Sequence, residues 1–466
     1  MNREAAILAT LVVYKVLLVL IGLWAQRRTR DNSDFFLGGR GLGPLVAAIS
    51  SSASSSSAWT LLGVSGAAYA WGVSALWLFP ATVSGFLINW LWVAPRLMPA
   101  ARASGALTLP EFIAGDGAMT ATILRVCSAI VVFSFLFYIA AQFQAAGDAF
   151  STTFGLDMRT SIAIGAAIVL LYTLLGGFWA VSVTDTLQGL LMALTAVMLP
   201  VAALLAVGGP TGLLAGLART EDLTALAPTG EFTGVAAIFF VLGTLGIGLG
   251  YPGQPHVVNR FMALRDERAL RQAQRIAIGW ALIVYTGMLL LGLCARVLVT
   301  QLGDGEQVFF VTAGSLFPPV IAGIMIAAVL SAIMSTADSQ LLVASSSLTH
   351  DLHRAAATDA PLRLSHTRVV VAIITLAAMG LAILAPDTIF QRVLFAWHAI
   401  GSAFGPVVVV RLLGRVVDSR FVLASILSGF LLTVGLHWLP NMPGDALERL
   451  LPLAIASLIV WLGSRR

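Results

Sequence analysis

The stretch Ile49-Ser50-Ser51-Ser52-Ala53-Ser54-Ser55-Ser56-Ser57-Ala58-Trp59-Thr60 places seven serines in eight consecutive positions, inside an apolar segment long enough to cross a membrane. A polar group in hydrocarbon costs free energy unless it finds a partner, so this run should face protein or a water-filled cavity. Serine hydroxyls also compete for backbone hydrogen bonds and can free carbonyl oxygens. Two interpretations follow: close helix packing through small residues, or oxygen ligands for a hard cation such as Na⁺.

Composition places the whole chain in a membrane. Its 466 residues are 58% hydrophobic and only 11% charged, whereas soluble domains carry about 25% charged residues. The net charge of +5 does not indicate a nucleic-acid partner, because the basic residues lie between apolar stretches. Cys127 and Cys294 both lie in apolar segments, so neither a disulfide framework nor a thiol metal site is expected. We expect no cleavable signal peptide and no obligatory protein partner.

Thirteen apolar stretches of sufficient length predict transmembrane helices. They lie near residues 5–25, 44–67, 74–97, 121–150, 160–178, 185–207, 232–253, 272–299, 318–349, 367–384, 388–411, 420–437 and 447–463. Every second connection is rich in arginine: Arg27, Arg28, Arg30 and Arg40; Arg96, Arg102 and Arg125; Arg260, Arg265, Arg268, Arg271 and Arg275; Arg354, Arg363 and Arg368; Arg411, Arg415 and Arg420; Arg465 and Arg466. The positive-inside rule then predicts a multi-pass protein of a bacterial plasma or inner membrane, with the N-terminus outside and the C-terminus cytoplasmic.

The connections near 208–231 and 350–366 are the longest, and neither has room for a nucleotide-binding or catalytic domain. We therefore expect one integral membrane domain over residues 1–466, with any transport driven by an ion gradient. A second interruption occurs in Leu245-Gly246-Ile247-Gly248-Leu249-Gly250-Tyr251-Pro252-Gly253-Gln254-Pro255-His256, where four glycines and two prolines cannot sustain a regular helix. The two breaks lie five stretches apart. That odd offset is typical of inverted-repeat transporters, whose broken helices line a central site.

Several motifs resemble the sodium/solute symporter family, and among its members the sodium/proline symporters most. They are Phe36-Leu37-Gly38-Gly39-Arg40-Gly41-Leu42-Gly43-Pro44, the segment Gly248 to His256 with Arg260-Phe261-Met262-Ala263 behind it, Leu174 with Gly176-Gly177-Phe178, Val183-Thr184-Asp185-Thr186-Leu187-Gln188, and Met334-Ser335-Thr336-Ala337-Asp338-Ser339-Gln340-Leu341-Leu342. The resemblance covers nearly the whole chain. It implies an all-α fold of the leucine-transporter type, with inverted five-helix repeats over 44–207 and 232–411, one extra helix at 5–25 and two at 420–463.

The resemblance also implies a Na⁺ site between the first broken helix and the helix near 318–349. Its ligands would be the carbonyls of Ala53, Ser56 and Ala332 and the hydroxyls of Ser335 and Thr336. The alternative for the two hydroxyls is bonding to their own preceding turn. Independently of the family, Ser335, Asp338 and Ser339 have the i, i+3, i+4 spacing of one helix face.

Two carboxylates lie at membrane depth, where each costs roughly 2.5–3.5 kcal/mol on insertion scales and usually marks an ion or proton path. Some family members have a second sodium site at the position of Asp185, and here Asp338 and Ser339 lie in the same neighbourhood. The pair could hold a second cation or share a proton. The alternatives are a helix cap for Asp185 and a structural hydrogen bond for Asp338.

One departure from the family pattern concerns coupling. Sodium/proline symporters have an aspartate where this chain has Ser55, so the carboxylate that strengthens Na⁺ binding is missing. We expect weaker sodium dependence, a shift of that role to Asp338 and Asp185, or H⁺ coupling. Arg40 matches a family arginine near the inner gate, or is a plain positive-inside charge. His256 and His350 are expected to be solvated at cytoplasmic helix ends.

The substrate site should combine apolar or aromatic side chains with a few polar groups. By resemblance its residues are Ser57, Ala58, Gly63, Tyr138, Ile247, Tyr251 and Pro255, with Trp59 as a possible platform. Half-helix N-termini favour a carboxylate, which suits an amino acid. Proline is the first expectation, although Ile247 replaces a family tryptophan and Ala58 a glycine; both tyrosines could simply be packed in the core.

The sequence therefore predicts a symporter that couples Na⁺ entry to uptake of a small amino acid by alternating access. Alternatives within transport are pantothenate, a short carboxylate or a choline-like cation, and H⁺ in place of Na⁺. A membrane solute sensor is a weaker alternative, because no output domain is expected after Arg466. An enzyme is not expected, because no catalytic constellation stands out.

Overall fold

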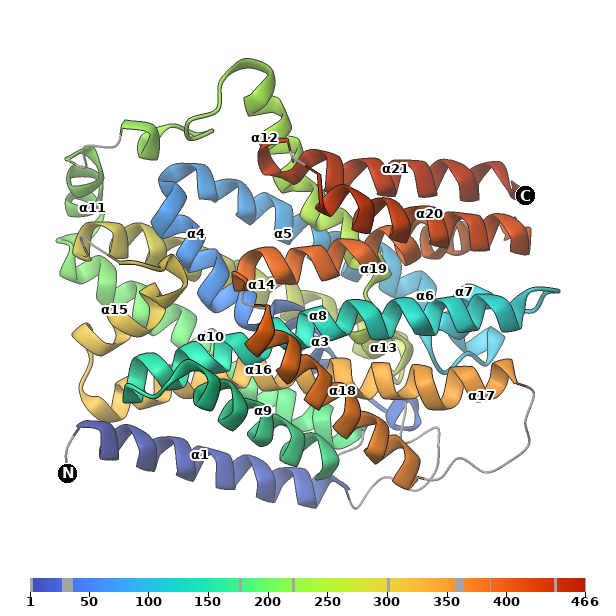
Figure 1. The fold of residues 1–466 in the computed structure, drawn as a ribbon, viewed down its shortest axis with the longest axis horizontal. Coiled ribbons are helices and arrows are strands. Elements are labelled where there is room, and N and C mark those ends of the chain that lie inside the picture. Colours follow the sequence, from blue (N-terminus) through green and yellow to red (C-terminus); the bar gives the residue numbers. More distant parts are fainter. Residues whose placement is uncertain are drawn as a thin grey trace.

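The computed structural model describes residues 3–26, 37–175, 178–219, 223–299, 302–356, 364–385, 387–439 and 442–465. Among the quoted motifs and basic clusters, Phe36, Gly176, Gly177, Arg27, Arg28, Arg30, Arg363 and Arg466 lie outside these residues. Long helices run side by side along the length of the molecule (Figure 1). The α-helices are α1 (Arg3–Gln26), α3 (Pro44–Ala58), α4 (Val64–Trp71), α5 (Leu78–Leu87), α6 (Ala94–Ser104), α7 (Leu109–Ala114), α8 (Thr120–Phe154), α9 (Met158–Leu175), α10 (Phe178–Ala206), α11 (Gly209–Ala218), α12 (Gly234–Gly246), α13 (Pro255–Met262), α14 (Glu267–Leu298), α15 (Val308–Leu316), α16 (Pro319–Ser346), α17 (Leu352–Ala355), α18 (Leu364–Leu384), α19 (Ile389–Leu412), α20 (Ser419–His437) and α21 (Ala446–Leu462).

Short 3₁₀ or π turns connect or extend these helices. They are η1 (Gly38–Arg40), η2 (Trp59–Gly63), η3 (Gly72–Trp77), η4 (Ile88–Val93), η5 (Leu223–Leu226), η6 (Ile247–Gly253), η7 (Gly305–Gln307), η8 (Ser347–Asp351) and η9 (Pro443–Asp445). The β-structure of the described residues is one antiparallel pair of short strands, β1 (Val416–Val417) and β2 (Ser464–Arg465), with an isolated bridge between Leu42 and Leu264.

Each expected apolar stretch lies mostly on helical residues where the structure describes it, which confirms the all-α membrane fold. Within the described residues, ten helical segments are long and apolar enough to cross a bilayer, and one of them, Pro44–Ser104, contains two of the expected stretches. The helices α9 and α21 are shorter, so the number of thirteen passages remains a prediction. Figure 1 shows α1 beginning at the end of the molecule opposite to that where α21 finishes. Exposed apolar side chains such as Leu8, Val12 and Leu17 cover α1, as expected of a helix that faces lipid.

The serine run forms a helix that breaks. Helix α3 is regular until Ser57, whose backbone has φ 50° and ψ −173°, and the chain then continues through the π turn η2 into α4. All residues from Ala47 to Ala58 are buried. The run therefore faces protein on every side. The helix breaks at Ser57, because a non-glycine residue at positive φ interrupts the helical hydrogen-bond pattern.

The second break matches the expected position. Helix α12 passes into the 3₁₀ segment η6, Gln254 is extended, and the short helix α13 begins at Pro255. Glycine is required here by close approach: a Cβ on Gly250 would lie 2.6 Å from Nε1 of Trp397, and a Cβ on Gly85 would lie 2.1 Å from the Tyr251 ring. The broken segment thus packs directly against α19 and α5.

One expectation for this region is wrong. His256 and Arg260 do not lie in a solvated cytoplasmic connection, because α13 folds back into the bundle and packs against α3. His256 is fully buried and Arg260 is 1% exposed. An amphipathic turn after a proline-glycine break resembles a loop in sequence, yet here it is the second half of the broken helix.

Candidate functional site

The proposed Na⁺ ligands of α3 and α16 meet in the structure. The hydroxyl of Thr336 lies 3.4 Å from the carbonyl oxygen of Ala53 and 3.2 Å from that of Ser54. The Ser335 hydroxyl donates to the Ala332 carbonyl at 3.2 Å, which is the bond to its own preceding turn expected as the alternative to cation binding. Ser335 also lies beside α3, because Ser54 Oγ donates to the Ser335 carbonyl at 3.1 Å. All of these groups are buried, so the carbonyl and hydroxyl oxygens form a dry cluster of the kind that a hard cation requires.

Ser56, the remaining proposed ligand, is engaged differently. Its carbonyl accepts the backbone N–H of Trp59, and its hydroxyl lies beside the hydroxyl of Tyr285. A carbonyl oxygen has a second lone pair, so this turn leaves it able to ligate a cation. Ser55, at the position of the missing aspartate, donates its hydroxyl to the Ser52 carbonyl at 2.9 Å within its own helix.

A second polar cluster lies one turn earlier on α3. Asp185 of α10 accepts the hydroxyls of Ser50 at 2.8 Å and Ser54 at 3.3 Å, and forms a 3.1 Å ion pair with Arg260. Arg260 also donates to Ser339 at 2.6 Å and to Ser50 at 3.1 Å. Asp185 is therefore not a helix cap at the surface, because it is fully buried in this network.

Asp338 is fully buried on α16, and neither of its carboxylate oxygens has a hydrogen-bond partner of normal geometry among the described residues. Asp185, Arg260 and Lys15 lie within electrostatic reach of it. The Lys15 ammonium, on α1, contacts the sulfur of Met334 one turn before Asp338. A buried carboxylate with so few hydrogen bonds is costly, and such groups in membrane proteins commonly serve ion or proton binding.

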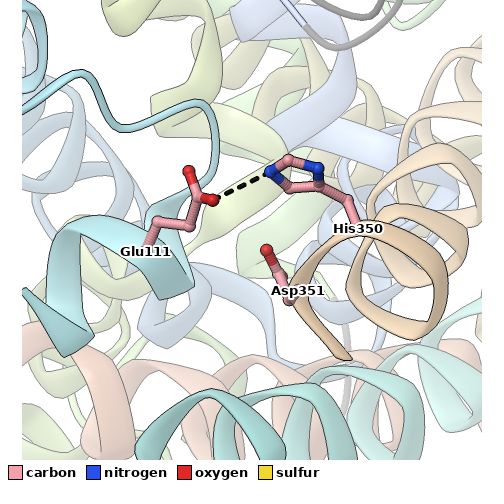
Figure 2. Close-up of side chains that lie close together, drawn as sticks. All are labelled: Glu111, His350 and Asp351. Atoms are coloured by element: carbon pink, nitrogen blue, oxygen red, sulfur yellow. Dashed lines mark hydrogen bonds and ion pairs between the residues drawn. The ribbon is translucent and has the colours of Figure 1, made fainter. Parts of the chain in front are cut away.

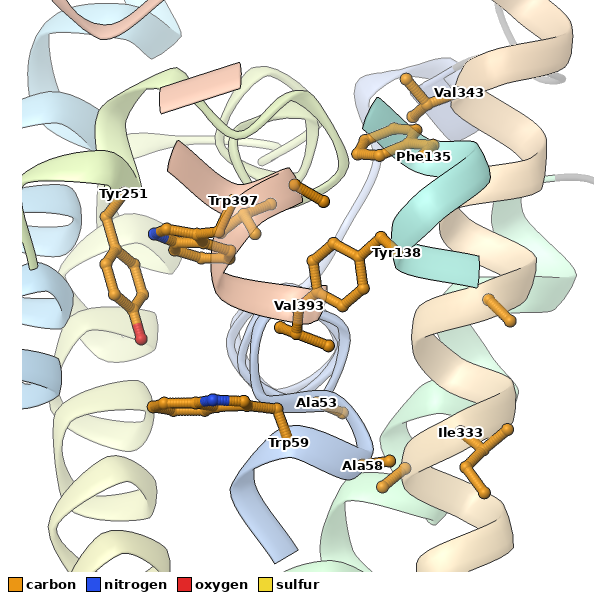
Figure 3. Close-up of a cluster of buried hydrophobic side chains, with 14 of the residues drawn as sticks. Ala53, Ala58, Trp59, Phe135, Tyr138, Tyr251, Ile333, Val343, Val393 and Trp397 are labelled. Atoms are coloured by element: carbon orange, nitrogen blue, oxygen red, sulfur yellow. The ribbon is translucent and has the colours of Figure 1, made fainter. Parts of the chain in front are cut away.

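Aromatic rings from four segments converge beyond the α3 break (Figure 3). Trp59 follows the break, Tyr138 comes from α8, Tyr251 from η6 and Trp397 from α19. Tyr251 and Trp397 pack edge to face with ring centroids 4.7 Å apart, and the Tyr138 hydroxyl lies 3.4 Å from Ser57 Oγ. This arrangement brings Ser57, Ala58, Tyr138 and Tyr251 together as the sequence predicted.

The other three predicted substrate residues have mainly backbone or packing roles. The carbonyl of Ile247 accepts Nε1–H of Trp397 at 3.2 Å, and Pro255 starts α13. Gly63 packs against Trp59 and Phe390, since a Cβ there would be 3.2 Å from the Trp59 ring and 3.4 Å from the Phe390 ring.

Four residues of this region were not singled out as site residues by the sequence. Gln142 of α8 accepts the backbone N–H of Ala58 at 3.1 Å, directly at the break. Trp397 and Tyr285 contact Tyr251, and His256 packs against Tyr138 with centroids 5.9 Å apart. In the sequence, only the polar side chains of Gln142 and His256 within apolar segments could have indicated these site residues. An apolar stretch alone does not reveal which helix face lines a binding site.

A cavity of about 420 Å³ lies at the end of the bundle that carries the α4–α5 connection. It is lined by Trp71 of α4, Phe240 of α12, Phe390 of α19 and Arg449 of α21, among others. Phe390 separates it from the aromatic cluster, with its ring centroid 5.5 Å from that of Trp59.

The opposite end is held by polar contacts. Arg40, in η1, donates to the carbonyls of Ala101 at 3.3 Å and Ala106 at 2.9 Å, and so ties the start of α3 to the end of α6. A solvated positive charge would not need two hydrogen bonds to backbone carbonyls, so Arg40 has a structural role at this end of the bundle.

A nearby cluster joins α7 to η8 and α17, and Figure 2 shows three of its side chains. Glu111 contacts His350 and Arg354, each at 2.8 Å, while Thr108 donates to Asp351 at 2.8 Å. Burial raises the pKa of Glu111, but the hydrogen bonds from His350, Arg354 and the Leu107 N–H lower it to about 2. Glu111, His350 and Asp351 are close enough to share a metal ion, yet the Arg354 guanidinium already occupies Glu111. The arrangement is therefore that of an ion-pair latch, and His350 is not simply solvated.

Two broken helices that meet at the centre of a bundle, with oxygen ligands on one side and aromatic rings on the other, define the class of ion-coupled secondary transporters. A family model described as the sodium:solute symporter family matches residues 35–429. The chain belongs to this family, and Na⁺ is its coupling ion.

Relatives and solved structures agree with that assignment. The chain is 36% identical to the osmoregulated proline transporter OpuE of Bacillus subtilis (91% of this chain, 87% of the relative) and 35% identical to the high-affinity proline transporter PutP of the same species (95% and 94%). It is 34% identical to a sodium/proline symporter of Staphylococcus aureus (97% and 90%). A Na⁺-coupled sialic acid symporter shares its fold with a TM-score of 0.81 at 16% identity (99% of both chains), and MhsT with L-phenylalanine gives 0.54 at 14% (91% and 98%). These likenesses confirm the leucine-transporter-type fold.

Proposed function

We propose that this protein is a Na⁺/L-proline symporter of the bacterial plasma membrane that works by alternating access. The sodium/proline symporter and the proline transporters among its relatives cover nearly its full length. The observation that carries the proposal is the junction at the α3 break, where the Ala53 carbonyl meets Thr336 and, one turn later, Ser57 meets Tyr138. Cation and substrate would thus bind to consecutive turns of one broken helix.

The same junction suggests how a zwitterionic imino acid would be bound. At the break, the Ala58 N–H donates to the Gln142 side chain and the Trp59 N–H lies 3.1 Å from Ser57 Oγ, so both N–H groups would exchange these side-chain partners for a substrate carboxylate. Such N–H groups favour a carboxylate. The pyrrolidine ring would pack against Trp59, Tyr138 and Trp397, which are apolar, rigid and close together.

Sidedness and the extent of the repeats belong to the proposal. The arginine-rich ends of α6 and α14 and the Glu111 cluster would face the cytoplasm, and the 420 Å³ cavity would be the external vestibule. Residues 44–207 and 232–411 would be the inverted repeats, with α1, α20 and α21 outside them. Arg40 would stabilise the closed inner gate through its bonds to the α6 end.

A proteoliposome experiment tests the proposal. Purified protein is reconstituted, and uptake of radiolabelled L-proline is followed under an imposed inward Na⁺ gradient, an inward H⁺ gradient, or neither. We expect accumulation with Na⁺ and its loss when the Na⁺ gradient is collapsed by an ionophore. Uptake driven by H⁺ without Na⁺ would contradict the Na⁺ coupling. No uptake under either gradient would overturn the proline assignment.

A further inference from the structure

A groove of about 740 Å³ lies between α19, α21, the turn η4 and the broken segment η6, and is named here the α19–α21 groove. It shares no lining residue with the 420 Å³ cavity. Pro252 and Pro406 form its buried floor, and Leu249, Leu453 and Leu458 are among its apolar walls. Its volume is within the range of about 300–1,000 Å³ that is typical of ligand sites.

The α19–α21 groove follows the helices inward from one end of the bundle. Its lining on α19 runs from Leu413, directly after the helix, back to Gly405. Its lining on α21 runs from Trp461 back to Leu453. Each run covers about 12 Å of helix, because a helix rises 1.5 Å per residue. The groove therefore has nearly the depth of one leaflet, which is roughly half of a 30 Å hydrocarbon core.

The groove is also the place where the second broken helix reaches the outer surface of the bundle. Of the seven residues of η6, six are buried, whereas Leu249 is 41% exposed and lines the groove. Leu249 directly precedes Gly250, which packs against the Trp397 ring. A molecule in the groove would therefore contact the segment that carries Tyr251, one of the rings of the aromatic cluster.

The rim of the groove is positively charged. The CZ atom of Arg415 lies 4.2 Å from the centroid of the Trp461 ring. The CZ atom of Arg96 lies 4.7 Å from that of the Trp92 ring, and both tryptophans line the groove. In the part of the chain that the structure describes, neither guanidinium forms an ion pair with a carboxylate. Their charges are therefore available to an anion from outside the protein.

We propose that the α19–α21 groove binds one phospholipid with an anionic headgroup, whose acyl chain lies against Leu249 and whose headgroup lies at Arg96 and Arg415. The apolar walls match an acyl chain, and arginine beside tryptophan at a membrane interface matches a lipid phosphate. The rim lies at the end proposed above to face the cytoplasm, where the leaflet surface is negative. This inference goes beyond the proposed transport, because it adds a ligand and does not depend on the substrate.

The experiment uses phosphatidylglycerol with a photoreactive acyl chain in proteoliposomes of the wild-type protein, and the adducts are mapped by mass spectrometry. We expect adducts on residues 453–458 of α21, and competition by unlabelled phosphatidylglycerol but not by phosphatidylcholine. The exposed apolar face of α1, which includes Leu17, is the internal reference. It should be labelled through ordinary contact with the bilayer and show no preference between the two competitors.

Variants test the charge and the shape of the groove separately. Arg96→Gln with Arg415→Gln should lower the groove adducts roughly 30-fold relative to α1, about fivefold for each positive charge removed. Arg415→Lys keeps the charge and should keep the adducts. Arg420→Gln is the matched control, because Arg420 is an exposed arginine of the same connection that does not line the groove. Leu458→Trp should fill the groove and remove the adducts with both arginines in place, since Leu458 is 58% exposed and has room for a larger ring.

Equal competition by phosphatidylcholine in the wild type would overturn the proposal, and so would undiminished groove labelling after loss of both arginines. Crosslinks between two chains at the groove without a lipid adduct would show that a second copy covers it, and would also refute the proposal. If the arginine variants fail to fold, the competition in the wild type decides. None of these measurements uses proline, so failure of this inference is distinct from failure of the proline assignment, which appears as absent uptake.

Discussion

Removal of the Thr336 hydroxyl should weaken Na⁺ activation strongly while leaving the bundle folded. Thr336 is buried, and its Oγ1 lies 3.4 Å and 3.2 Å from two carbonyl oxygens of α3, so it is a side-chain oxygen between the two helices that would share the ion. A hydrogen-bond-like contact to a charged group contributes about 1.5–3 kcal/mol. Because each 1.4 kcal/mol is tenfold in affinity, Thr336→Ala should raise the Na⁺ concentration for half-maximal uptake roughly 10- to 150-fold.

The assay is a Na⁺ titration of proline uptake into proteoliposomes at constant osmolarity. Thr336→Ser keeps a hydroxyl and should remain close to the wild type. Ser345→Ala is the matched control on the same helix, because the Ser345 hydroxyl donates to the Leu342 carbonyl of its own turn at 2.9 Å and does not face α3. If Thr336→Ala shifts the half-maximal Na⁺ concentration by less than about threefold, well under 1 kcal/mol, the α3–α16 oxygen cluster does not bind the coupling ion.

Two further perturbations test the packing and the latch. Gly250→Ala places a Cβ 2.6 Å from Trp397 Nε1, and such overpacking typically costs about 1–3 kcal/mol. Uptake and the thermal unfolding temperature should therefore both fall. Gly279→Ala is the control, because its added Cβ would meet nothing within 4 Å. Glu111→Gln removes the carboxylate that pairs with Arg354, and the lowering of its pKa from 4.5 to about 2 corresponds to at most about 3 kcal/mol. Since a depressed carboxyl pKa stabilises only above the unfolded pKa, the variant's deficit in thermal stability should shrink as the pH falls from about 4.5 towards 2. A deficit that grows over that range would contradict the ion-pair interpretation.

Local chemistry was enough to predict the breaks. Seven serines in eight positions and a cluster of glycines with prolines both violate the pattern of a lipid-facing helix, and both positions are irregular in the structure. The contact between Thr336 and Ala53 was available only through the resemblance, because no spacing rule relates residues 283 positions apart. The charge of Arg260 was visible, but its location was not.

Arginine placement is a statistical guide, and Arg260 shows where it fails. The residue lies five positions before Arg265, which is exposed, so the sequence groups both in one basic connection. The pairing with Asp185, 75 residues away, offsets the cost of burying the guanidinium, together with the hydrogen bonds to Ser50 and Ser339. Gln142 and Trp397 were missed for a related reason, since each acts through a backbone group of a distant broken segment.

The serine run links these contacts, because its successive faces serve different partners. Ser50 and Ser54, one turn apart, face Asp185; the carbonyls of Ala53 and Ser54 face Thr336; and Ser57, one turn after Ala53, faces Tyr138. Any rotation or tilt that separates α3 from α16 must therefore disturb the ion ligands and the substrate contact together. In this arrangement coupling needs no long-range pathway, since ion and substrate would act on one rigid turn, and the Arg260 pair would hold the preceding turn in register while the ion comes and goes.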